Sequence, residues 1–135
     1  MKIVIDVNIL FSALIRDSST RHYIIESNND FFIPRVALES LMKYQAMILR
    51  KSSATENELK ELLKSLLTRI KLVPRAVFSK DLDKALDVMR DIDEEDSVFV
   101  ACSLSISGSI IWSDDKHLKK QKLVKVCTTE ELFSR

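Results

Sequence analysis

The sequence predicts one three-layer α/β/α domain, residues 1–135, with a mostly parallel sheet of about five strands. Three observations support this fold class. The chain has 135 residues, which is enough for one domain with one core. Its composition, 46% hydrophobic and 30% charged, is that of a globular protein. Short strand patterns alternate with helical patterns along the whole chain, which is typical of a parallel sheet covered on both faces.

Five short apolar runs are predicted as strands. The first is β-branched and apolar at every position, as in a strand buried on both faces. A proline directly follows two of the others, and proline ends a strand because it lacks the backbone N–H donor. The predicted strands are Ile3–Ile5, Phe31–Ile33, Ile70–Val73, Ser109–Trp112 and Leu123–Cys127.

Helices are predicted where apolar residues recur every three or four positions. Thr55 to Glu58 is a capping box, and it opens the helix with the most regular apolar spacing. One helix is expected from Arg35 to about Arg50, and Ser79 is expected to cap the helix that includes Leu82–Met89. Two further helices are predicted early in the chain: Ile9–Ile15, and one that is capped by Ser18, Ser19 or Thr20 and runs through about Glu26. Later in the chain the predicted helices are Ser97–Ser107, which Gly108 ends, and Asp115 to about Lys120. A terminal turn is expected to be capped by Thr128 or Thr129.

The composition excludes several kinds of site. Lysine plus arginine number 21 and aspartate plus glutamate 20, so the net charge indicates neither nucleic acid nor membrane. A single glycine rules out the glycine-rich dinucleotide and Walker A loops. Cys102 and Cys127 are expected to be reduced core residues, and His22 and His117 to be surface residues. No signal peptide or membrane-spanning run is recognised, so a cytoplasmic location is expected.

Acidic residues lie where parallel sheets bind ligands, outside the carboxyl ends of the strands. Asp6 ends the first predicted strand, and Asp115 follows the fourth. Asp93 and Asp96 lie at the start of the helix that leads into the fourth strand. Glu39 lies about one turn into the helix after the second strand. The candidate site is therefore a cluster of carboxylates.

Such a cluster needs a cation or protons to be stable. Two carboxylates about 4 Å apart repel by about 4 kcal/mol at an effective dielectric constant near 20. Oxygen ligands favour hard ions, so Mg²⁺ or Mn²⁺ is expected. Because Mg²⁺ held by carboxylates usually shares its coordination with a substrate phosphate, the pattern indicates phosphoryl chemistry.

Each acid also has a structural interpretation. Asp93 and Asp96 fit a capping pair, and Asp115 fits a cap of the short helix that follows it. Glu39 alone is typical of a solvated helix position. Asp6 is harder to explain in this way, because an acid directly after a buried strand is unfavourable without a partner.

Four motifs, in order and across residues 2 to about 132, resemble those of the PIN domain family. Ile3–Leu10 is similar to its opening strand that ends in D-x-N or D-x-S. Pro34–Glu39 is similar to its second motif, a glutamate early in a helix. Asp93–Cys102 resembles the D-x-x-D that precedes an apolar, alanine-containing helix. Ser113–Leu118 resembles the fourth motif, usually T-x-D-K-x-L.

The resemblance implies a metal-dependent ribonuclease, such as the toxin of a VapC-like prokaryotic toxin–antitoxin pair. It implies four acids that hold one or two Mg²⁺ or Mn²⁺ ions, namely Asp6, Glu39, Asp96 and Asp115. Asp93 would be an accessory acid, and Asn8 and Ser113 would be supporting polar groups. A homodimer, a protein antitoxin, and products with a 5′-phosphate and a 3′-hydroxyl are also implied.

Three positions depart from the family pattern. Ser113 replaces the usual threonine and keeps its hydroxyl, and Pro34 stands where serine is common. Asp114 stands where glycine or asparagine is common, which leaves open whether Asp114 or Asp115 is the main ligand.

The densest basic stretch follows Asp115 directly. Its lysines could contact nucleic acid, because phosphate contacts dominate such binding, or they could simply form a solvated face. The nearest members are Lys116, Lys119 and Lys120, followed by Lys122 and Lys125.

Two other classes of function are considered. One is a catalytically inactive PIN-like binding or scaffold module. The other is another Mg²⁺-dependent α/β phosphohydrolase. A haloacid-dehalogenase-type phosphatase needs a second aspartate where Asn8 stands, and a receiver domain needs one after the third strand, where the chain has Val73-Pro74-Arg75.

Overall fold

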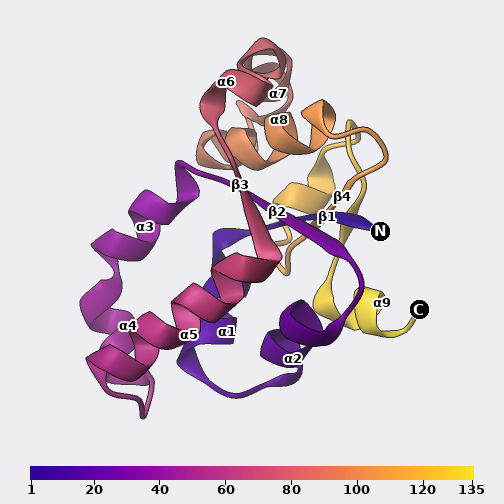
Figure 1. The fold of residues 1–135 in the computed structure, drawn as a ribbon. Coiled ribbons are helices and arrows are strands. Elements are labelled where there is room, and N and C mark those ends of the chain that lie inside the picture. Colours follow the sequence, from indigo (N-terminus) through magenta and orange to yellow (C-terminus); the bar gives the residue numbers. More distant parts are fainter.

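The computed structural model describes residues 1–135 and contains one five-stranded sheet in which every strand pairs in parallel (Figure 1). The strand order is β3-β2-β1-β4-β5. The strands are β1 (Lys2–Ile5), β2 (Asp30–Pro34), β3 (Ile70–Val73), β4 (Ile110–Trp112) and β5 (Val126–Cys127).

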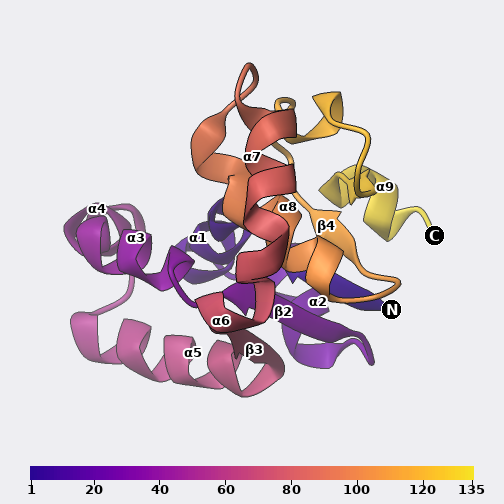
Figure 2. The ribbon, with the colours of Figure 1, turned by 90° about the horizontal axis from the view of Figure 1, so that it is seen from above.

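Helices cover both faces of the sheet, so the predicted three layers are confirmed. Helices α6, α7 and α8 lie on one face and α1, α2 and α5 on the other (Figures 1 and 2). The α-helices are α1 (Val7–Ile15), α2 (Ser19–Glu26), α3 (Ala37–Lys43), α4 (Gln45–Lys51), α5 (Glu56–Arg69), α6 (Arg75–Phe78), α7 (Leu82–Met89), α8 (Ser97–Ser105) and α9 (Thr129–Phe133). Three short 3-10 helices complete the set: η1 (Ser79–Asp81), η2 (Glu94–Asp96) and η3 (Leu118–Lys120).

The core is one cluster of 31 buried apolar residues. The three β-branched residues Ile3, Val4 and Ile5 of β1 are fully buried, as expected for a central strand covered on both faces. Helix α8 is apolar nearly all round because it contacts β1, β2 and β4 beneath it and α6 and α7 beside it. None of the helices combines the length and the hydropathy needed to cross a bilayer.

Several local predictions are confirmed. Thr55 and Glu58 form both reciprocal hydrogen bonds of the capping box at the start of α5. Thr128 caps α9 in the same way. Gly108 has φ +78°, the left-handed conformation that favours glycine, in the turn between α8 and β4.

The helix predicted from Arg35 to about Arg50 is two helices, α3 and α4. They meet at Tyr44, whose ψ of 15° interrupts the helical path. The ring of Tyr44 packs edge-on against Phe11 of α1, with 6.0 Å between ring centroids. The prediction of one helix was wrong because the apolar spacing continues on both sides of Tyr44 and does not reveal the non-helical residue between the two helices.

The predicted cap at Ser79 was also wrong. The chain enters α6 directly after Pro74 and continues through η1 into α7. The Ser79 hydroxyl donates to the carbonyl of Ala76 and caps no helix, because residues on both sides of Ser79 are already helical.

The segment after β4 has less regular structure than predicted. The short helix expected from Asp115 is only η3, and the strand expected over Leu123–Cys127 is only β5. The buried amide of Gln121 accounts for the shorter strand. Its oxygen accepts the N–H groups of Leu123 and Val124, which therefore need no neighbouring strand.

Strands β1 and β4 are neighbours at the point where the strand order reverses. From β1 the chain adds β2 and then β3 on one side of β1. It then crosses to the other side, where it adds β4 and β5. Open parallel sheets bind ligands at such a switch point, beyond the carboxyl ends of the strands. Asp6 follows β1 and Ser113 follows β4 at this edge.

Candidate metal centre

Asp6 and Ser113 are joined directly across the two central strands. The register pairs Ile5 with Trp112, so the residues that follow them lie side by side. Ser113 Oγ donates a hydrogen bond of 2.7 Å to Asp6 Oδ2 and accepts one of 3.0 Å from the N–H of Asp115. One hydroxyl thus links the acid after β1 to the acid after β4.

Asp6 is an acid in a nearly dry position, with 3% of its surface exposed. Its other oxygen, Oδ1, caps α1 by accepting the N–H of Asn8 at 3.4 Å. Burial raises the pKa of Asp6, and the hydrogen bonds from Ser113 and Asn8 offset part of that rise. Asn8 therefore supports Asp6 through its backbone, while its side chain is exposed.

Asp96 lies just before α8 and has a buried carboxylate oxygen, Oδ2, with no hydrogen-bond partner. The capping interpretation does not account for it, because its side chain makes no capping hydrogen bond to α8. Burial, followed by the charges of Asp6, Asp93 and Asp115, raises the pKa of Asp96 to about 7. An unpartnered carboxylate oxygen beside other acids is a site that a cation would satisfy.

Asp93 has both of the roles considered from the sequence. It caps η2 by accepting the N–H of Glu95 at 3.2 Å. It also offers a carboxylate oxygen that lies within 4.8 Å of ligand atoms on Asp115 and His117. Capping therefore uses Asp93 without removing it from the acid cluster.

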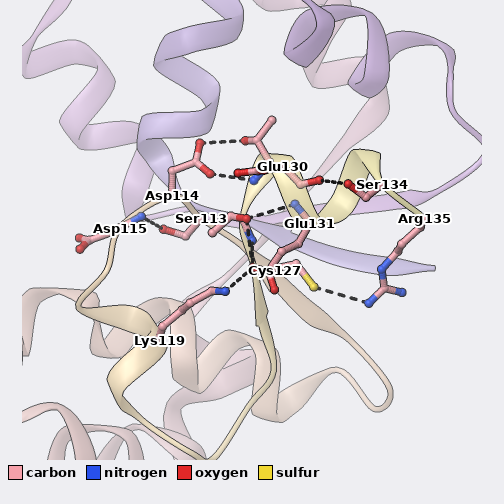
Figure 3. Close-up of polar contacts among 11 residues, drawn as sticks. Ser113, Asp114, Asp115, Lys119, Cys127, Glu130, Glu131, Ser134 and Arg135 are labelled. Carbon is pink, nitrogen blue, oxygen red and sulfur yellow. Dashed lines mark hydrogen bonds and ion pairs between the residues drawn. The ribbon is translucent and has the colours of Figure 1, made fainter.

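Asp114 and Asp115 point in different directions (Figure 3). Asp114 accepts hydrogen bonds from the backbone N–H of Thr129 at 2.7 Å and from its hydroxyl at 2.8 Å, at the start of α9. Asp115 instead lies beside Asp96, whose pKa its charge helps to raise, and has a carboxylate oxygen within 4.8 Å of one on Asp93. Asp115 is therefore a member of the acid cluster, whereas Asp114 anchors the start of α9.

His117 belongs to the surroundings of this cluster, although the sequence indicated only a surface residue. Its side chain is 52% exposed, and its Nδ1 lies 3.4 Å from Asp115 Oδ1. The same oxygen accepts the backbone N–H of His117 at 2.8 Å. The spacing Asp-x-His, which allows this local turn, was the one available signal.

Glu39 lies in the first turn of α3, beyond the carboxyl end of β2 and so at the same edge of the sheet. Its side chain is exposed, and Glu39 is not among the acids whose charges act on Asp96. The structure therefore brings together Asp6, Asp93, Asp96, Asp115 and Ser113, and Glu39 remains a candidate on the strength of its position alone.

No lysine or arginine neutralises the cluster, since none forms an ion pair with its aspartates. Among the three nearest lysines, Lys119 is engaged elsewhere, in an ion pair with Glu131 of α9. This contact and the capping hydrogen bonds from Thr128 lower the pKa of Glu131 to about 2. Lys116 and Lys120 are exposed and form no ion pair.

These features define a parallel α/β domain with an acid-lined site at the switch point of its sheet, whose donor set fits a hard divalent cation. Comparison with protein-family models agrees: the PIN domain model matches residues 4–133, and the chain belongs to the PIN domain family. PIN domains are generally metal-dependent nucleases, which suggests a nuclease here. No curated protein matches the chain.

Proposed function

We propose that this chain is a metal-dependent endoribonuclease. In this proposal Asp6, Glu39, Asp96 and Asp115 hold one or two Mg²⁺ or Mn²⁺ ions. The observation that carries it is the buried, unpartnered Oδ2 of Asp96, which lies in the field of three other aspartates without a neutralising cation. The charged form of such a group is unfavourable in the folded protein unless a proton or a cation compensates for it.

The chain's own residues would prepare this site in distinct ways. Ser113 fixes the Asp6 carboxylate through its hydroxyl, and the same hydroxyl holds the backbone of Asp115. Asp93, which is half-buried, adds negative charge beside Asp115. A bound divalent cation supplies Lewis-acid activation of the phosphodiester and of the attacking water. Products with a 5′-phosphate and a 3′-hydroxyl are expected from the motif resemblance.

RNA as the substrate is supported by the family and by two exposed lysines close to the acids in the chain. Lys116 directly follows Asp115, and Lys120 ends η3. Neither has an ion-pair partner, so both are available to phosphates. Lys119 is the weaker candidate, because Glu131 already neutralises it.

The role of toxin in a toxin–antitoxin pair, with a protein antitoxin and a homodimeric state, is a further part of the proposal. It is supported by the motif resemblance and by membership of the PIN family. Light scattering tests the dimer. A small protein encoded beside this chain that binds it and blocks RNA cleavage would support the antitoxin.

The central test is cleavage of end-labelled RNA by the purified chain in Mg²⁺, in Mn²⁺ and in EDTA. We expect cleavage only with a divalent ion and none by Asp96→Asn. Asp114→Asn is the matched control, because Asp114 binds Thr129 and should be dispensable for cleavage. Metal binding without cleavage would favour the scaffold module. Hydrolysis of phosphomonoesters alone would favour the phosphohydrolase.

A further inference from the structure

One ring nitrogen of His117 lies close to a carboxylate oxygen of each of two aspartates. Ligand atoms of Asp93, Asp115 and His117 all lie within 4.8 Å of one another. Neighbouring ligands of an octahedral ion lie about 3 Å apart when each bond is about 2.1 Å. The 3.4 Å between Nδ1 of His117 and Oδ1 of Asp115 is already close to that spacing.

Hydrogen bonds of the local backbone fix the main chain at His117. The N–H of His117 donates to Asp115 Oδ1 at 2.8 Å, and the N–H of Asp115 donates to the buried hydroxyl of Ser113. A chain of short contacts therefore connects His117 to Asp6 through Ser113. The imidazole therefore extends from the same hydrogen-bonded loop that carries Ser113 and Asp115.

The other histidine shows what an ordinary surface ion pair looks like in this protein. His22 also contacts two carboxylates, but through opposite ring nitrogens: Nε2 lies 2.7 Å from Asp17, and Nδ1 lies 3.3 Å from Glu26. No single nitrogen of His22 meets both acids, so they cannot share a cation with it. His117 differs because one of its ring nitrogens lies within 4.8 Å of carboxylate oxygens of both Asp93 and Asp115.

We propose that His117 is a nitrogen ligand of a cation held with Asp93 and Asp115, and that it makes this PIN domain prefer Mn²⁺, Co²⁺ and Ni²⁺ over Mg²⁺. The inference rests on the metal site of the proposed function. An imidazole ligand strengthens binding of the later divalent metals, whereas Mg²⁺ favours oxygen ligands and water. The buried, unpartnered Asp96 Oδ2 beside Asp115 is the second feature that a cation here would satisfy.

The test uses the full chain without a histidine tag, as wild type, His117→Ala and His22→Ala. Pulsed electron paramagnetic resonance of bound Mn²⁺ detects coupling to a directly bound imidazole nitrogen. We expect this coupling in wild type and His22→Ala and its loss in His117→Ala. In calorimetric titrations His117→Ala should weaken Ni²⁺ and Co²⁺ binding at least about tenfold and Mg²⁺ binding less than about threefold.

The outcomes separate this inference from the nuclease proposal. Nitrogen coupling that depends on His117 in a protein that cleaves no RNA would support His117 as a ligand and count against the nuclease. Mn²⁺-dependent RNA cleavage without any imidazole coupling would overturn the role of His117 as a ligand and would still support the nuclease proposal. Equal loss of Mg²⁺ and Ni²⁺ binding in His117→Ala would also overturn the preference. No binding of any divalent ion would overturn both.

Discussion

The hydroxyl of Ser113 donates a hydrogen bond of 2.7 Å to Asp6, joining residues 107 positions apart in the chain. The bond crosses from the end of β4 to the end of β1 and fixes the most buried acid of the site. It also explains how serine can stand where the family usually has threonine, because either residue presents the hydroxyl at this point.

Removing that hydroxyl should therefore weaken both the fold and the metal site. We expect Ser113→Ala to lower the free energy of unfolding by about 1–3 kcal/mol, because Asp6 Oδ2 loses its only donor in a buried place. Mn²⁺ affinity, measured by calorimetry, should fall as well. Ser113→Thr should restore both. A stable Ser113→Ala with unchanged affinity would contradict a positioning role.

The metal-free protein should lose stability as the pH rises from about 4 to about 7. The folded-state pKa of Asp96 is raised to about 7, and that of Asp6 is also raised, from an ordinary value of 3.8. A raised carboxyl pKa stabilises the fold fully below the unfolded pKa, and this contribution is lost as the pH passes the folded pKa. Urea denaturation should show a fall of about 1–3 kcal/mol, after allowance for solvent screening.

The variant Asp96→Asn should flatten this pH profile, and saturating Mg²⁺ should do the same to the wild type. His22 provides an internal reference. Glu26 and Asp17 raise the pKa of His22, so the stability that protonated His22 contributes is lost as the pH rises above about 6.5. This loss should persist in Asp96→Asn. A wild-type profile that is flat between pH 4 and pH 6 would show that neither burial nor the neighbouring charges raise the pKa of these acids.

Replacing the buried acid after β1 should separate activity from stability. Asp6→Asn should abolish metal-dependent RNA cleavage and leave the melting temperature of the metal-free protein unchanged or higher, because one repelling charge is removed. Asp30→Asn is the matched control, since Asp30 is exposed at the opposite end of the sheet, in β2. Marked loss of stability in Asp6→Asn would mean that Asp6 is mainly structural.

The two neighbouring aspartates should give opposite phenotypes. Asp114→Ala should lower the stability by about 1 kcal/mol, because α9 loses two hydrogen bonds at Thr129, and should keep its Mn²⁺ affinity. Asp115→Asn should lose Mn²⁺ affinity with little change in stability. Thermal denaturation with and without Mn²⁺ measures both effects. The reverse pattern would give Asp114 the role of ligand.

The exposed lysines should contribute unequally to RNA binding. Lys116→Gln and Lys120→Gln should each weaken binding and reduce the slope of log affinity against log salt by about one. Lys119→Gln should change that slope less, because Glu131 already neutralises this lysine. Fluorescence anisotropy with a labelled RNA in the absence of divalent ions measures all three. If the slopes of all three variants equalled that of the wild type, the interpretation of the lysines as a solvated face would be favoured.

Apolar spacing was sufficient to predict the layers of the fold and most of its elements. Ile3–Ile5 indicated a buried strand, and Thr55 with Glu58 indicated the start of α5, because β-branched runs and capping boxes act within a few residues of the chain. The break at Tyr44 was not predicted, because the apolar spacing continues on both sides of it; in the structure the ring of Tyr44 packs against Phe11 of another helix.

By itself the sequence determined which acids follow which strands, and hence that a crowded anionic site was to be expected at one edge of the sheet. Tertiary structure alone decided how the side chains are used: Asp114 binds Thr129, Asp115 faces Asp96, and His117 lies against Asp115. Adjacent residues have nearly identical local signals. Only the neighbours supplied by β1, η2 and α9 distinguish their environments, because hydrogen bonds and desolvation depend on atoms that are distant in the chain.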